Sequence, residues 1–147
     1  MNNFAIDIQF DIEINEKNLE RHLIAAAVAT LQQQRVKKPA TLTVLLTDDQ
    51  QLRVLNRDYR GFDETTDVLS FTDGTELPEM GLYLGDIAIS VPQAQRQADQ
   101  QGHPLLDELR LLTVHGVLHL LGHDHAEPEE KERMWSAQEI VLNQLKQ

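Results

Sequence analysis

The chain has 147 residues and a formal net charge of −11, with 13 Lys and Arg against 24 Asp and Glu. This balance is opposite to the basic surface of most nucleic-acid-binding domains, so any RNA partner must meet a local basic patch. The absence of cysteine excludes disulfides and thiolate metal sites, and no apolar run is long enough for a signal peptide or a membrane span. We therefore expect a cytoplasmic protein without a membrane partner.

The N-terminal third of the chain predicts a strand, a helix and a second strand. Apolar residues at every even position from Phe4 to Ile14 predict a strand with one buried face. Asn15 is the expected cap of the helix that follows. The apolar stripe of that helix is Leu19, Leu23, Ala26, Ala27 and Leu31, and the second strand carries Leu42, Val44 and Leu46 on one face.

The middle third predicts a helix followed by a strand pair. Thr47-Asp48-Asp49-Gln50 has the pattern of a capping box and opens a helix that ends before Gly61. A short strand is expected from Asp67 to Phe71, and a polar loop containing Asp73-Gly74 follows it. A strand from Tyr83 to Ile89 is then expected antiparallel to the first.

The last third predicts three helices. Ser90-Val91-Pro92-Gln93 caps a Gln-rich helix that runs to about Gln101. Pro104 opens a helix that is hydrophobic nearly all round, as expected of a buried central helix, and Pro128 starts a final amphipathic helix. Residues 1–147 are thus predicted to form a single α+β domain, with a small mixed sheet of about four strands covered by about five helices.

Four of the six histidines lie within the stretch from His115 to His125. His115 and His119 are four residues apart, so on a helix their rings project from the same face. Gly122 can adopt a positive φ and end the helix, which lets the chain fold back and bring His125 toward that pair. Three imidazoles without a fourth protein ligand are typical of a catalytic zinc site, which we expect at the end of the central helix.

His123 offers an alternative third ligand. It is four residues after His119, so an unbroken helix would place its ring on the same face as His115 and His119. A left-handed residue at Gly122 would instead turn His123 away from that face.

The histidine spacing also fits a degenerate metzincin protease motif. In that motif a glutamate, the general base that activates the metal-bound water, occupies the position of Gly116. Since glycine has no side chain, a protease would need a base from elsewhere. A third alternative is a non-catalytic ribosome-assembly factor, whose metal only fastens the turn between Gly122 and His125 to the helix.

The roles of three arginines and of one aspartate are each open to two interpretations. Arg53, Arg57 and Arg60 could form the basic patch that the acidic total lacks, or could be paired with nearby acids. We take Arg57 and Arg60 as candidate substrate contacts. Asp124 could orient a ligating histidine or cap the turn.

Three motifs resemble those of the bacterial YbeY endoribonuclease family, and the resemblance spans nearly the whole chain in order. They are Leu55-Asn56-x-x-Tyr59-Arg60-Gly61-x-Asp63-x-x-Thr66-Asp67-Val68-Leu69-Ser70-Phe71, then Leu84-Gly85-Asp86-Ile87, then His115-Gly-x-Leu-His119-Leu-x-Gly122-x-Asp124-His125.

The resemblance implies a single-strand-specific, metal-dependent endoribonuclease of the cytoplasm. In that family the activity serves maturation of 16S rRNA at its 3′ end and quality control of ribosomes, so single-stranded rRNA and the small ribosomal subunit are the implied partners, and DNA is not expected. The three zinc-binding histidines of the family fall on His115, His119 and His125, and its functionally important arginine falls on Arg60. Position 123 usually holds tyrosine in the family, which cannot supply an imidazole, so the comparison favours His125 over His123.

The chemistry of these residue types suits phosphodiester cleavage. A divalent ion, with Zn²⁺ expected, can polarise a phosphoryl oxygen or lower the pKa of its bound water to about 7. Arg60 would stabilise the negative charge of the transition state through paired hydrogen bonds. The attacking oxygen belongs to water or to the RNA 2′-hydroxyl, and the sequence leaves both open.

Overall fold

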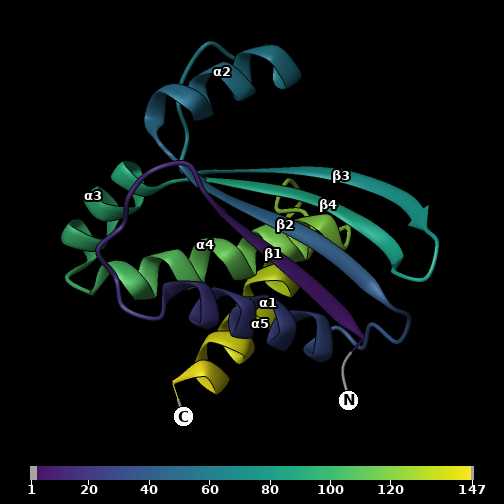
Figure 1. Cartoon of the computed structure of the whole chain (residues 1–147). Helices are drawn as coiled ribbons and strands as arrows, with labels where there is room; N and C mark the ends of the chain where they lie inside the picture. The colour runs from purple at the N-terminus through teal and green to yellow at the C-terminus, as the bar shows by residue number, and fades with distance from the viewer. Residues whose placement is uncertain (1–2, 147) are drawn as a thin grey trace.

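The computed structural model describes residues 3–146, which form a four-stranded mixed sheet and five helices (Figure 1). β1 (Phe4–Phe10) is parallel to β2 (Ala40–Thr47), and β2 is parallel to β4 (Gly81–Ser90). β3 (Val68–Leu77) is antiparallel to β4, and the strand order is β1-β2-β4-β3. The predicted α+β class is confirmed, and β3 forms one edge of the sheet.

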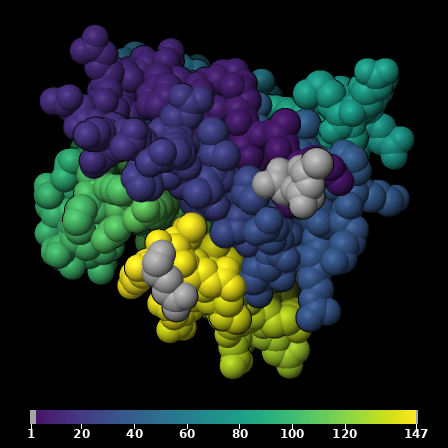
Figure 2. Space-filling model, turned by 60° about the horizontal axis from the view of Figure 1, so that its bottom comes forward, coloured from purple at the N-terminus to yellow at the C-terminus, as the bar shows by residue number. Residues whose placement is uncertain are grey.

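The helices divide between the two faces of the sheet (Figure 1). They are α1 (Leu19–Gln33), α2 (Asp49–Arg60), α3 (Val91–Gln101), α4 (Leu105–Leu120) and α5 (Pro128–Leu145). α1 and α4 cover one face, and α5 packs on both of them, whereas α2 contacts β3 and β4 from the other side. Figure 2 shows α5, in yellow, at the surface beside the blue N-terminal segments. Within residues 3–146, no helix combines the length and the apolar character needed to cross a bilayer.

The core lies between the sheet and the layer of α1 and α4. The predicted stripe of α1 is buried, as are the predicted inward residues of β2. α4 contacts α1, α3, α5, β3 and β4 and is buried on nearly all sides, so the prediction of a central helix is confirmed.

α4 and β4 approach each other closely at Gly116. A Cβ atom added to Gly116 would lie 2.7 Å from Cγ2 of Ile87, a fully buried side chain of β4. Glycine therefore allows the helix to lie directly on the sheet at this point.

The first predicted strand and helix differ from the structure at their boundaries. β1 ends at Phe10 rather than Ile14, because β2 supplies pairing partners only as far as Leu46 opposite Phe10. Ile12 and Ile14, which follow β1, still pack against the core. The prediction of Asn15 as helix cap is wrong, since α1 begins at Leu19 and is preceded by Asn18 in the left-handed region at φ 58°.

Two further boundaries were predicted wrongly. The cap of α2 is Asp48, which accepts a hydrogen bond from the Gln51 amide at 2.9 Å, while Thr47 ends β2 and donates to Asp11. β3 does not stop at Phe71 but continues through Asp73-Gly74, where the pairing register with β4 shifts. The expected turn is thus an irregularity within a longer hairpin, whose tip projects from the molecule (Figure 1).

Candidate active site

A cavity of about 570 Å³ lies where the C-terminal end of α4 meets β3. The end of α2 and the segment that leads from it to the edge strand β3 contribute residues to the same cavity. The cavity is lined by Arg60, Thr66, Asp67, Val68, Leu69, Ser70, Thr72, His115, His119, Gly122, His123, Asp124 and His125.

The structure brings His115, His119 and His125 together. The Nε2 atoms of His115 and His119 are 3.1 Å apart, and one ring nitrogen from each of the three histidines lies within 4.8 Å of the others. Two nitrogens held by one tetrahedral zinc ion lie about 3.4 Å apart, so the spacing of the pair on α4 fits such an ion, and the exposed His125 offers a third nitrogen. Elsewhere in residues 3–146, no His, Cys, Asp or Glu side chains gather in a comparable group of three.

The turn after α4 explains how His125 reaches the pair. Gly122 has a φ of 98°, and its amide donates to the carbonyl of His119 at 3.0 Å. The next amide, of His123, donates to the carbonyl of Leu118 at 3.0 Å, which completes a Schellman motif. The prediction that Gly122 ends the helix with a positive φ is confirmed.

His123 lies apart from the three-histidine group. Its Nε2 atom is 2.6 Å from the side-chain oxygen of Gln34, the residue that caps the end of α1. Asp124 accepts a hydrogen bond from the His125 amide at 2.7 Å. Of the two roles that the sequence allows for Asp124, this contact matches the capping of the turn.

Burial keeps the two histidines of α4 neutral. Desolvation lowers the pKa of His115, an effect opposed by the hydrogen bond between its ring nitrogen and the accepting side-chain oxygen of Gln138. Desolvation, together with the neighbouring His115 and His125, lowers the pKa of His119 to about 4. Both rings are therefore unprotonated at neutral pH, the form in which imidazole binds a metal.

Gln138 is a contact that the sequence did not reveal. Its side-chain oxygen, on α5, lies 3.1 Å from Nδ1 of His115. A proton on Nδ1 would donate to this oxygen and leave Nε2 free to face the cavity. A glutamine within an amphipathic helix carries no signal of such a role.

The three arginines of α2 have different surroundings. Arg53 pairs with Asp63 at 2.8 Å and Arg57 with Asp58 at 3.1 Å, as the ion-pair interpretation expects. Arg60 instead lines the cavity and, among the described residues, has no carboxylate within 4.0 Å. Arg57 does not line the cavity, and its contact with substrate stays a prediction.

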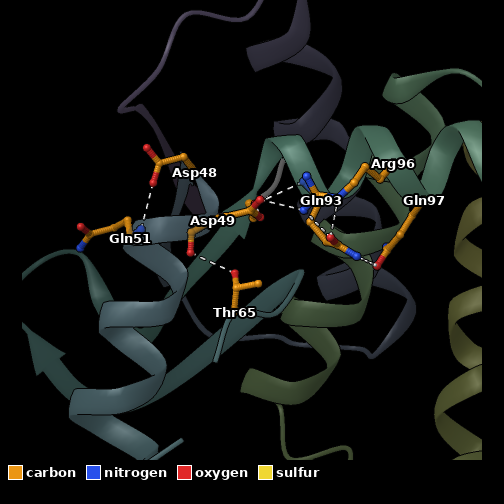
Figure 3. A network of polar contacts seen from close by, with 8 residues as sticks. Asp48, Asp49, Gln51, Thr65, Gln93, Arg96 and Gln97 are labelled. Atoms are coloured by element: carbon orange, nitrogen blue, oxygen red, sulfur yellow. Dashed lines mark hydrogen bonds and ion pairs between the residues drawn. The ribbon is translucent and has the colours of Figure 1, made fainter. Parts of the chain in front are cut away.

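Polar contacts fasten α2 and the segment after it. The Asp49 side chain accepts from Arg96 of α3 at 2.7 Å, and its backbone carbonyl accepts from Thr65 at 3.0 Å (Figure 3). Asn56 donates to the carbonyl of Glu64 at 2.9 Å, so the segment that borders the cavity is held to α2.

A second group of polar contacts supports Asp67, another residue that lines the cavity. Gln97 donates to Asp67 at 3.2 Å and to the buried Glu108 at 2.9 Å. Glu108 is also 2.7 Å from Nε2 of His103. These residues link α3 and the start of α4 to the wall of the cavity.

The family follows from comparison with known proteins. The family described as Endoribonuclease YbeY matches residues 5–146. The chain belongs to the YbeY endoribonuclease family. It is 42% identical to a Brevibacillus brevis protein named Endoribonuclease YbeY, over 92% of each chain. It is 41% identical to the protein of that name from Geobacillus thermodenitrificans, over 96% of this chain and 97% of the relative.

A solved structure supports the YbeY-type fold. The solution structure of TM1509 from Thermotoga maritima superposes with a TM-score of 0.64 at 23% identity, covering 97% of this chain and 88% of the other. Membership of the YbeY family makes the chain a hydrolase of the endoribonuclease class. The comparisons give the protease alternative no support.

Proposed function

We propose that this chain is a metal-dependent endoribonuclease that cuts single-stranded RNA in the cytoplasm, matures the 3′ end of 16S rRNA and serves quality control of ribosomes. The observation that carries the proposal is the convergence in one cavity of three imidazoles and of Arg60, which has no carboxylate partner among the described residues. The small ribosomal subunit is then the partner that presents the RNA, and the chain acts as one domain.

The proposed metal ligands are His115, His119 and His125, which would hold one divalent ion. Zinc suits a site of neutral imidazoles without thiolates. When bound, the ion would supply Lewis acidity toward the phosphodiester group. The ring of His115 would keep its orientation through Gln138.

Arg60 is proposed to stabilise the transition state. Its guanidinium borders the cavity, and no carboxylate of residues 3–146 lies within 4.0 Å to neutralise it, so it is available to a phosphate group. The planar guanidinium can donate two hydrogen bonds to phosphate oxygens as negative charge builds on them. Arg57, exposed on the same helix, is proposed to contact a neighbouring phosphate.

Cleavage of a short single-stranded RNA tests the proposal. We expect cleavage by protein loaded with zinc, loss of cleavage after chelation, recovery on adding metal, and little cleavage of the same sequence in a duplex. His119→Ala serves as the inactive control.

Two results would support the alternatives instead. Metal-dependent cleavage of a peptide would favour a protease. A protein that requires metal for stability, binds the small ribosomal subunit and leaves RNA intact would favour an assembly factor.

A further inference from the structure

Two exposed aromatic residues flank Arg60 in the sequence, the arginine that lines the cavity. Tyr59, in the last turn of α2, is 71% exposed, and Phe62 is 52% exposed. Among the described residues Tyr59 is the most exposed large hydrophobic side chain. We propose that Tyr59 and Phe62 stack against bases of the RNA strand that enters the cavity. This inference rests on the proposed function.

Arg60 connects these rings to the cavity. Its guanidinium carbon lies 5.5 Å from the centre of the Phe62 ring, and the same side chain lines the space beside the histidines. A nucleotide whose phosphate meets Arg60 therefore has a neighbouring base within reach of Phe62.

The Tyr59 ring packs against β3. Its centre lies 5.2 Å from that of Phe71, which packs with Leu52 on the α2 side of the sheet, while the neighbouring Ser70 and Thr72 line the cavity. The contact leaves most of the Tyr59 ring open to solvent. Such a ring offers a flat apolar face that accepts any base.

Both rings stand on a fixed support. Gly61, with a φ of 77°, turns the chain between Tyr59 and Phe62. The segment beyond is tied back to α2 by the Arg53–Asp63 pair and by the contact of Asn56 with the Glu64 carbonyl. A site that is already ordered loses less entropy when a strand binds.

The distribution of charge favours RNA over a protein partner. The chain as a whole carries −11, and Asp58 pairs with Arg57, yet Arg60 in the last turn of α2 has no carboxylate within 4.0 Å among the described residues. Arg60 is the charged residue that separates the two rings in the sequence. Alternation of aromatic and cationic side chains is typical of surfaces that bind single strands.

The test compares variants that remove a ring with variants that keep one. Tyr59→Leu and Phe62→Leu remove the aromatic face, while Tyr59→Phe and Phe62→Tyr retain it. Phe10→Leu is the matched control, because Phe10 is 47% exposed on β1, the edge of the sheet opposite β3. Thermal unfolding of every variant checks that the fold is intact.

Affinity is measured by fluorescence anisotropy of a labelled short single-stranded RNA with metal-loaded protein, before cleavage becomes measurable. Each leucine variant at Tyr59 or Phe62 is expected to raise the Kd by about fivefold or more, the lower range for loss of one base–aromatic stack. The ring-keeping variants and Phe10→Leu are expected to match the parent. RNA containing 2-aminopurine should be quenched by the parent and less so by the leucine variants.

Three results would overturn the inference. If the parent cleaves RNA and the leucine variants bind it as tightly as the parent does, the stacking role is wrong and the proposed function stands. If RNA affinity is unchanged but association with the small ribosomal subunit is lost, the rings contact a protein. If the parent neither binds nor cleaves single-stranded RNA, the proposed function fails and the inference fails with it.

Discussion

Nδ1 of His115, on α4, lies 3.1 Å from the side-chain oxygen of Gln138, on α5. The two helices are joined only by a turn and a short loop, so this contact couples the orientation of a candidate metal ligand to the docking of the C-terminal helix. The buried Met134, Ala137 and Val141 fix that docking.

Gln138→Leu should lower metal affinity by about tenfold or more, the range observed when a hydrogen-bond partner of a ligating histidine is lost. Competition against a zinc-binding dye measures the affinity. Gln138→Glu keeps an acceptor and should stay near the parent value, as should Gln144→Leu, an exposed change on the same helix. Equal affinity for Gln138→Leu and the parent would show that the contact does not support the site.

His123→Tyr should retain about one metal per chain, whereas His125→Ala should lose most of it, because a preformed site depends on each of its ligands. The physical reason is the turn at Gly122, after which His123 contacts Gln34 and His125 faces the pair on α4. Elemental analysis after purification without added metal gives the stoichiometry. The reverse pattern would identify His123, rather than His125, as the third metal ligand.

Arg60→Lys should lower RNA cleavage by about a hundredfold while leaving metal content and folding unchanged, by analogy with the loss of one oxyanion donor. Lysine keeps the charge but cannot donate two parallel hydrogen bonds to a phosphate. Single-turnover cleavage measures the effect, with Arg21→Lys on the exposed face of α1 as control. Unaltered cleavage by Arg60→Lys would leave this arginine without a role in the reaction.

The metal-free protein should lose stability as the pH falls from about 6.5 to about 4. The pKa of His119 is lowered from 6.5 to about 4 in the folded chain, chiefly by burial, so between these values the unfolded state binds the proton and the folded state does not. Below pH 4 this contribution stops changing. Urea unfolding in the presence of chelator measures the trend, and His119→Gln should make it shallower. An identical pH dependence for the parent and His119→Gln would contradict the assignment of this loss of stability to His119.

Gly116→Ala should destabilise the protein by about 1–3 kcal/mol, the usual cost of overpacking a core. The added methyl group would lie 2.7 Å from Ile87. Urea unfolding tests this, and Gly116→Ala should cost less in an Ile87→Ala background than in the parent, since the two changes share one space. Additive effects of the two substitutions would place the strain elsewhere.

Features that depend on neighbouring residues in sequence were predictable. The spacing of His115 and His119 placed two rings on one face, and Gly122 marked the end of their helix, because both follow from helical geometry alone. The capping role of Ser90 was likewise predicted, and its side chain accepts from the Gln93 amide at 3.3 Å.

Features that depend on distant segments were not predictable. Asp73-Gly74 has the composition of a turn, and Gly74 indeed has a φ of 97°, but pairing with β4 on either side absorbs it into a strand. The contact of Gln138 with His115 requires α5 to dock on α4. The contact of Gln97 with Asp67 requires α3 to lie beside the cavity.

The three candidate ligands differ in how firmly the protein holds them. His115 and His119 stand on a helix packed on nearly all sides, whereas His125 stands on an exposed connection that Gly122 begins and Pro128 ends. Opening of that connection alone would detach one ligand while the rest of the fold stayed intact. Exchange of the ion would then be governed by the local opening of a few residues, and could be fast in a protein whose global unfolding is slow.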